Sequence, residues 1–469
     1  MGKNIKSVVS NLSVAFIANL VSLLGSTVLT LVLPGFIGIE QYAYYQLYIF
    51  YASYVGFFGI GWIEGIYLRY GGQYYDKIDT SLFSAQIRLF SVFETILGII
   101  VFIAAFIFSR SDGNKTIVFA CFAICIFVYM PRALLHNLLQ TTGRIKEYAI
   151  GVIIEKVIHI CLTTLGVVLG RQFFSWYIIS DLIGRTVAAA YIFIVCRDIV
   201  KTKPISYGKC SIEIRNNIIG GLALMISNVA GMLVIGVMRQ AIEIVWDIQT
   251  FGKISLTLTC SNLLMTFINS TAFVVFPMLK RADESSLVSF YSFMRTILMV
   301  IVSGMLIFYY PGKILLSMLL PQYEESLQYM AVLFPICVYE SKMSLLINTY
   351  MKSLRKERLL LLINLIAVLG SLIAAFFTCF IMRSLNHAIF AILILIIIKC
   401  TLAEVILSKY IEIRVIKDII LELIVTIGFI ISSWTIGRYV GVVIYIVVYA
   451  VYIFIKNNDI KRALCFLRK

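Results

Sequence analysis

Long apolar stretches run through the whole chain, and the connections between them are alternately basic and nearly neutral. About fourteen such stretches can be distinguished, most of them roughly 20 residues long, which is enough for a helix to cross a hydrocarbon core of about 30 Å. Backbone groups in lipid must be satisfied within the spanning structure, and these runs lack the alternating polarity of barrel strands. The pattern predicts an all-α integral membrane protein with about 14 transmembrane helices and no soluble domain.

The composition excludes a water-soluble fold. Of the 469 residues, 61% are hydrophobic and 14% are charged, whereas soluble domains are about 45–50% apolar and about 25% charged. We expect the helices at about 12–33, 42–66, 84–108, 116–139, 147–169, 173–196, 217–238, 249–276, 289–310, 327–350, 358–382, 387–409, 417–436 and 439–455.

The basic residues predict the orientation. Lys and Arg are retained on the cytoplasmic side during insertion, and 25 of the 40 fall in every second connection and at the two ends of the chain. The connections on the other side carry seven: Arg110, Lys115, Arg171, Arg239, Lys313, Arg383 and Arg438. Both termini are therefore expected in the cytoplasm. The net charge of +16 is explained by these loops and by anionic membrane lipids, so no nucleic-acid partner is expected.

A weak internal repeat predicts two lobes. Asn137 precedes Arg144 by seven residues, and Asn348 precedes Arg355 by the same spacing, each pair after a helix of corresponding position. We expect an N-terminal six-helix lobe at 1–200, a cytoplasmic linker at 201–216 and a C-terminal six-helix lobe at 217–410. Two extra transmembrane helices and a basic cytoplasmic tail then occupy 411–469.

Three segments resemble a known family. They are Leu33-Pro34-Gly-Phe-Ile-Gly-Ile-Glu-Gln-Tyr, the stretch from Gly59-Ile-Gly61-Trp to Arg69-Tyr-Gly-Gly, and Gln140-Thr-Thr-Gly143-Arg144-Ile-Lys-Glu-Tyr. With the helix layout over roughly residues 5–410, they resemble the polysaccharide or O-antigen flippases (Wzx-like) of the multidrug/oligosaccharidyl-lipid/polysaccharide (MOP) exporter superfamily.

The resemblance implies a MATE- and MurJ-like fold, with two six-helix bundles around a central cavity that opens alternately to either side. It implies a cargo of undecaprenyl-pyrophosphate-linked oligosaccharide, such as an O-antigen, lipopolysaccharide or capsule repeat unit. It also implies the bacterial cytoplasmic (inner) membrane as the location, and polysaccharide polymerase or assembly proteins as partners.

Charged residues within the expected helices are the candidate site. A charge near the bilayer centre costs about 2.5–3.5 kcal/mol even on the lenient insertion scale, so such residues face a cavity or a partner. The deepest cations are the candidates for binding an anionic head group, since Arg and Lys form charge-assisted hydrogen bonds to phosphate. They are Arg132, Lys156, Arg185, Lys342 and Lys399.

The acidic candidates could couple transport to H⁺ or Na⁺. They are Glu155, Asp181, Glu340 and Glu404.

Structural roles remain open for several charges. Asp181 and Arg185 are spaced to form a pair on one helix, whereas the adjacent Glu155 and Lys156 diverge by about 100° and are not expected to pair.

Other charges and two prolines have structural alternatives. Arg88, Arg295, Glu422 and Lys253 lie near the expected helix ends, where they could reach the membrane surface. Glu94 lies near Arg88 in sequence. Pro131 and Pro335 interrupt helices as candidate hinges, with a static kink as the alternative.

Three classes of function are distinguished by these features. A flippase for lipid-linked oligosaccharides is favoured by the cationic bias of the deep charges. An H⁺- or Na⁺-coupled multidrug antiporter of the same superfamily would use acids in its lobes, and the expected first and seventh helices carry none. A glycan polymerase or glycosyltransferase would have a large outer loop or a soluble catalytic domain. The sequence shows no catalytic, nucleotide or metal motif, so neither an enzyme nor a bound cofactor is expected.

We predict that topology reporters fused at residues 205 and 465 read cytoplasmic and that one fused at residue 320 reads external, because basic connections stay inside. Alkaline phosphatase and fluorescent-protein fusions measure this. The opposite assignment at residue 320 would contradict the predicted orientation.

Overall fold

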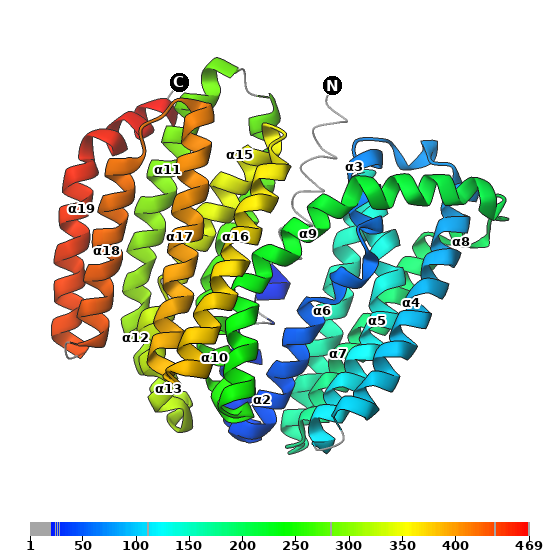
Figure 1. Cartoon of the computed structure of the whole chain (residues 1–469), viewed down its shortest axis with the longest axis horizontal. Coiled ribbons are helices and arrows are strands. Elements are labelled where there is room, and N and C mark those ends of the chain that lie inside the picture. Colours follow the sequence, from blue (N-terminus) through cyan, green and yellow to red (C-terminus); the bar gives the residue numbers. More distant parts are fainter. Residues whose placement is uncertain are drawn as a thin grey trace. The chain divides into compact units, whose positions relative to one another are not determined.

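The computed structural model describes residues 20–23, 25, 27, 29–109, 112–281, 284–435 and 438–467, without the side chains of 264, 266–287, 438–439 and 464–467. Half of the helix expected at 12–33 lies outside these residues. In the described part the chain is 90% helical and contains no strand, so the prediction of an all-α fold is confirmed. Figure 1 shows the order of the helices along the chain.

The chain divides into two compact units, Met1–Val229 and Ala230–Lys469. The boundary falls inside one continuous helix, α9 (Tyr207–Val245), and therefore after the linker expected at 201–216. The division of the chain at 1–200, 201–216, 217–410 and 411–469 stays a prediction.

The first unit consists of helices of very different lengths, joined by short connections. Before α9 they are α2 (Leu33–Ser53), η1 (Val55–Gly59), α3 (Trp62–Tyr70), η2 (Tyr75–Lys77), α4 (Thr80–Phe108), α5 (Gly113–Thr141), α6 (Ile145–Val168), α7 (Phe174–Val195) and α8 (Arg197–Lys201). Helix α5 is central to this unit, because α2, α3, α4, α6 and α7 all pack against it.

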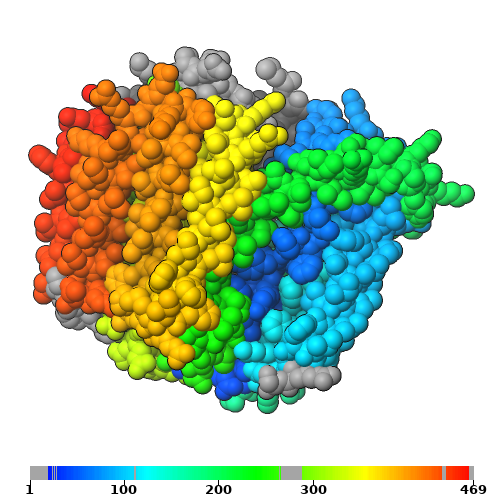
Figure 2. Space-filling view, viewed as in Figure 1, coloured from blue at the N-terminus to red at the C-terminus, as the bar shows by residue number. Residues whose placement is uncertain are grey.

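After α9, the second unit contains a further series of helices. They are α10 (Ile248–Arg281), α11 (Glu284–Met305), η3 (Leu306–Phe308), α12 (Tyr309–Leu319), η4 (Pro321–Tyr323), α13 (Glu324–Leu333), α14 (Ile336–Ser341), η5 (Lys342–Ile347), α15 (Asn348–Ser353), α16 (Glu357–Ala375), η6 (Phe376–Ile381), α17 (Leu385–Ile411), α18 (Ile416–Trp434) and α19 (Arg438–Leu467). Segments η5 and η6 are π-helical. Helices α16 and α17 form an outer face of this unit, yellow to orange in Figure 2.

Within the described residues, nine helices are long and apolar enough to cross a membrane, or up to eleven if each of two bent helix pairs is one span. These helices indicate a multi-pass membrane protein. The count of 14 stays a prediction.

The first unit has a sharp bend between α2 and α3. The two helical segments on either side of residues 60–61 meet at 64°, and both Ile60 and Gly61 adopt left-handed backbone conformations there, with φ of 48° and 78°. After the bend, α3 packs backbone to backbone against the start of α9, where a Cβ on Gly65 would overlap the carbonyl of Asn217. A glycine at position 65 therefore permits the close approach.

We predict that Gly65→Ala destabilises the protein by about 1–3 kcal/mol, because the added methyl group forces α3 away from α9. Thermal unfolding of the purified protein in detergent measures the loss. Gly56→Ala is the matched control, since no atom lies within 4 Å of a Cβ there. Equal stability of the two variants would contradict the close packing.

Candidate functional site

In the first unit, α6 and α7 come close together where their charged residues lie. A Cβ on Gly184 would be 2.7 Å from the carbonyl oxygen of Glu155, so only glycine allows this spacing. The close approach places Glu155, Lys156 and His159 of α6 beside Asp181 and Arg185 of α7.

Glu155 is held by two cations. It accepts a hydrogen bond from Arg132 of α5, and the Lys156 ammonium lies 3.3 Å from its other oxygen. The prediction that Glu155 and Lys156 do not pair is wrong, because the flexible Lys side chain folds back along its own helix. Arg132 is 2% exposed and Glu155 is 7% exposed, so this contact links α5 to α6 in the interior.

Asp181 is the second acidic centre. Its carboxylate accepts a hydrogen bond from Arg185 at 2.6 Å, which confirms the predicted pair on one helix, and another from the Tyr48 hydroxyl of α2 at 2.8 Å. His159 Nδ1 lies 3.5 Å from the other oxygen. Asp181 thus joins α2, α6 and α7.

An aromatic ring connects the two centres. The guanidinium groups of Arg132 and Arg185 lie 5.9 Å and 5.1 Å from the centroid of the Tyr129 ring of α5, which is cation–π distance. We call these side chains the N-terminal cluster: Tyr48, Tyr129, Arg132, Glu155, Lys156, His159, Asp181 and Arg185.

The N-terminal cluster has a surplus of positive charge. With His159 neutral, its three cations face two carboxylates. The surplus is also accessible, because the Lys156 side chain is 34% exposed, compared with 11% for Arg185 and 2% for Arg132. An anion could therefore contact Lys156 without the Arg132–Glu155 pair being broken.

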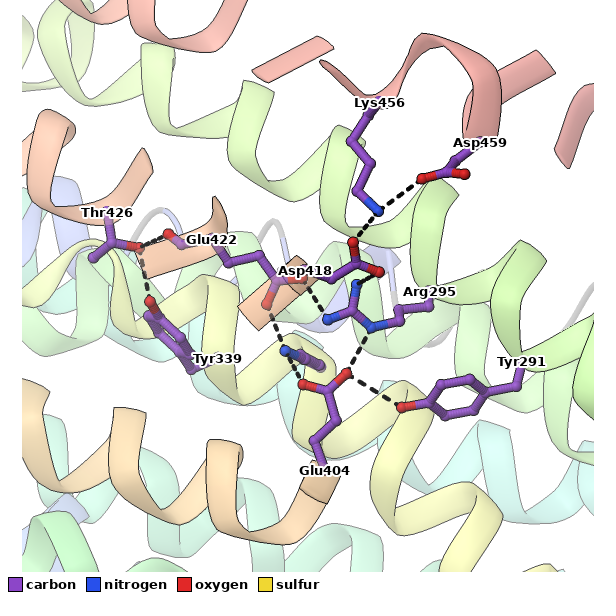
Figure 3. Close-up of polar contacts among 10 residues, drawn as sticks. Tyr291, Arg295, Tyr339, Glu404, Asp418, Glu422, Thr426, Lys456 and Asp459 are labelled. Atoms are coloured by element: carbon purple, nitrogen blue, oxygen red, sulfur yellow. Dashed lines mark hydrogen bonds and ion pairs between the residues drawn. The ribbon is translucent and has the colours of Figure 1, made fainter. Parts of the chain in front are cut away.

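In the second unit, four charged side chains form a closed ring. Arg295 of α11 contacts Glu404 of α17 at 2.6 Å and Glu422 of α18 at 2.8 Å. Lys342 of η5 contacts Glu422 at 2.5 Å and also pairs with Glu404. Figure 3 shows Arg295, Glu404 and Glu422 pointing toward one another from their separate helices. We call these four residues the C-terminal ring.

The C-terminal ring is balanced and closed to solvent. Two cations meet two carboxylates, and each side chain is at most 4% exposed. Asp418 of α18 extends the ring outward, because it accepts a hydrogen bond from Arg295 at 3.0 Å and pairs with Lys456 of α19 (Figure 3). The last two helices therefore supply charges that the interior of this unit needs.

Arg295 and Glu422 were expected to reach the membrane surface, and that interpretation is wrong. Arg295 is 3% exposed, because its guanidinium group is held inside the unit by Glu404 and Glu422. Glu422 is near the start of α18 but lies on its inward face, 2% exposed.

The remaining predicted residues belong to neither group. Lys399 of α17 donates to Glu340 of α14 at 3.2 Å. Pro131 lies inside the continuous helix α5. Pro335 lies at the break between α13 and α14, where the two helical segments meet at 46°.

The structure thus divides the candidates among three places. It brings Arg132, Lys156 and Arg185 together with Glu155 and Asp181. It places Lys342 and Glu404 in the C-terminal ring, and Lys399 with Glu340. Their roles in binding, coupling and hinge motion stay predictions. Sequence reasoning missed Tyr129, although its position three residues before Arg132 places both on one helix face.

We predict that Lys342→Met destabilises the protein by about 3–5 kcal/mol, because Glu404 and Glu422 are left with Arg295 alone. The double variant Lys342→Met/Glu422→Gln should recover most of this loss, since Arg295 and Glu404 then balance. Thermal unfolding in detergent measures both variants. A Lys342→Met protein as stable as the wild type would show that the ring does not hold this unit together.

No protein-family model matches the chain, and a comparison with curated proteins found no match. Solved structures do match in fold. A structure titled "Lipid II flippase MurJ, inward closed conformation" aligns with a TM-score of 0.67 and 15% identity, over 96% of this chain and 99% of that one.

Two MATE structures give similar results. An inward-facing multidrug resistance MATE family transporter of the MOP superfamily aligns with a TM-score of 0.62 and 12% identity, over 86% of this chain and 98% of that one. A MATE protein in complex with MaD3S aligns with a TM-score of 0.60 and 14% identity, over 87% and 96%. The predicted MurJ- and MATE-like fold is therefore confirmed.

Proposed function

We propose that this protein is a flippase that moves an undecaprenyl-pyrophosphate-linked oligosaccharide, an O-antigen or capsule repeat unit, from the inner to the outer leaflet by alternating access. The observation that carries the proposal is the N-terminal cluster, which has one more cation than carboxylates and presents Lys156 partly exposed in a buried setting. In this role the chain is a transporter and catalyses no reaction.

The chemistry of the cluster suits a pyrophosphate head group. Lys156 offers a mobile ammonium with three donors, and the guanidinium groups of Arg132 and Arg185 are held close by through Tyr129. Hydrogen bonds to charged groups contribute about 1.5–3 kcal/mol each. Because Glu155 and Asp181 stay neutralised by their own partners, an arriving anion is not repelled by a free carboxylate.

The location and partners follow from this role. A lipid-linked glycan is assembled on the cytoplasmic leaflet of the bacterial inner membrane, so we place the chain there with both termini in the cytoplasm. Polysaccharide polymerase or assembly proteins would receive the flipped unit. The apolar outer faces of the helices contact membrane lipids.

The alternative function is an H⁺- or Na⁺-coupled multidrug antiporter. The MATE structures support it through their similar fold. A site for cationic drugs would need surplus acidic charge, whereas the N-terminal cluster has surplus basic charge and the C-terminal ring is balanced. The flippase is therefore the better-supported proposal.

We predict that deletion of the gene causes undecaprenyl-linked repeat units to accumulate on the inner leaflet, and that Lys156→Gln restores surface glycan at least about tenfold less well than the wild type. Glu155 keeps Arg132 in this variant, so protein levels should be unchanged. Lipid-linked intermediates and surface glycan are measured in the complemented strain.

Lys146→Gln is the matched control, because Lys146 is an exposed lysine on the same helix outside the cluster. If Lys156→Gln gives as much surface glycan as the wild type, Lys156 does not bind the cargo. Drug sensitivity without any glycan defect in the deletion strain would favour the antiporter.

A further inference from the structure

Helix α4 has two contrasting faces. Its outer face carries Val92, Ile96 and Ile103, each more than half exposed, which suits contact with lipid. This helix lies at the surface of the first unit, light blue in Figure 2. The inner face, which packs against α5, carries Phe90 and Glu94, both with 0% exposure. Glu94 is near the middle of this 29-residue helix and so near the middle of the membrane span.

The Glu94 carboxyl group has no polar partner among the described residues. Both of its oxygens are buried and neither makes a hydrogen bond. The other buried acids of the first unit, Glu155 and Asp181, each contact at least one cation. Arg88, which is near Glu94 in sequence, donates instead to the carbonyls of Val200 and Thr202.

No charged group contacts Glu94 from the surrounding elements. Segments α5, α8 and η1 pack against α4, Trp62 of α3 contacts Phe90, and Asn217 of α9 donates to Gln86. The ionisable groups on α4, on these elements and on residues 207–229 of α9 are Arg88, Glu64, Tyr67, Arg69, Tyr70, Lys115, Cys121, Cys125, Tyr129, Arg132, His136, Arg197, Asp198, Lys201, Tyr207, Lys209, Cys210, Glu213 and Arg215; η1 has none. None of them forms a hydrogen bond or an ion pair with Glu94 in the described part of the chain.

An ionised carboxylate in such surroundings would be strongly destabilising, since nothing replaces its water. A neutral carboxyl group, which keeps its proton, avoids this cost. We propose that Glu94 is a proton-binding site of the transporter and that binding and release of this proton couple transport to a proton gradient. The coupling step depends on the proposed transport function, whereas proton binding does not.

A chain of polar contacts leads from the surface toward Glu94. Arg69, which is partly exposed, donates to Asn217 at 2.8 Å, and Asn217 donates to Gln86 at 3.0 Å. Gln86 lies two turns before Glu94 on the inner face of α4, and Phe90 lies between them. A motion of Phe90, which packs edge-on against Trp62, would let water reach Glu94.

Water is the only partner that the proton transfer needs, because it accepts the proton on release and donates it on rebinding. On release, the carboxyl O–H bond breaks, its electron pair stays on the carboxylate oxygen, and the proton passes to water. Rebinding from water on the other side of the membrane reverses the step.

The first test is labelling with dicyclohexylcarbodiimide, a lipid-soluble reagent that adds to neutral carboxyl groups. In the full-length protein at neutral pH, we expect at least about tenfold more label on Glu94 than on Glu155 or Asp181, which are held as ion pairs. Peptide mass spectrometry locates the label. Equal labelling of the three residues, or no label on Glu94, would overturn the proton site.

The second test uses Glu94→Gln, which keeps the shape of the neutral side chain, with Glu94→Asp as the variant that retains a carboxyl group. We expect wild-type protein levels for Glu94→Gln and about tenfold lower glycan export in response to an imposed pH gradient, with partial recovery in Glu94→Asp. If glycan export by Glu94→Gln responds to the pH gradient as strongly as export by the wild type, the coupling is overturned. If the wild type itself exports no glycan, the proposed function fails, and the labelling result still decides the proton site.

Discussion

A charge that enters the membrane interior needs a partner, and this constraint explains how the charged residues of the chain are arranged. Water is excluded from the hydrocarbon region, so an isolated ion near the bilayer centre costs at least about 2.5–3.5 kcal/mol. The chain meets the constraint by pairing charges between helices: Arg132 with Glu155 across α5 and α6, and Arg295 with Glu404 across α11 and α17. The same contacts that neutralise charge therefore fix which helices pack together.

The two units meet the constraint differently. In the first, three cations share two carboxylates, and the Lys156 side chain is partly exposed while its partners stay buried. In the second, two cations and two carboxylates close on themselves, and α18 supplies Glu422 to complete the ring. The first arrangement has one cation more than carboxylates and can therefore bind an anion. In the second, each cation is already paired with carboxylates of the same ring. In the proposed function the cargo head group therefore binds at the N-terminal cluster, and the last two helices contribute to the core of the second unit.

The sequence predicted the fold class well, because the length and apolarity of the helices follow from the thickness of the membrane. It also identified most of the residues that form the buried charge networks, since ionisable residues are rare in apolar segments. It could not show how they are partnered. The distance in sequence between Arg295 and Glu404 gives no sign of a contact, whereas Arg88 and Glu94 are close along one helix and make no hydrogen bond to each other. Such pairings depend on which helix faces meet.

Direct binding to the purified protein tests the central claim most clearly. The claim predicts that undecaprenyl pyrophosphate binds the wild type and the Lys146→Gln control equally, and binds Lys156→Gln at least about tenfold more weakly, because one charge-assisted contact is lost. Raising the salt concentration should reduce the difference between the proteins. Equal binding by all three proteins would contradict an anion site at the N-terminal cluster.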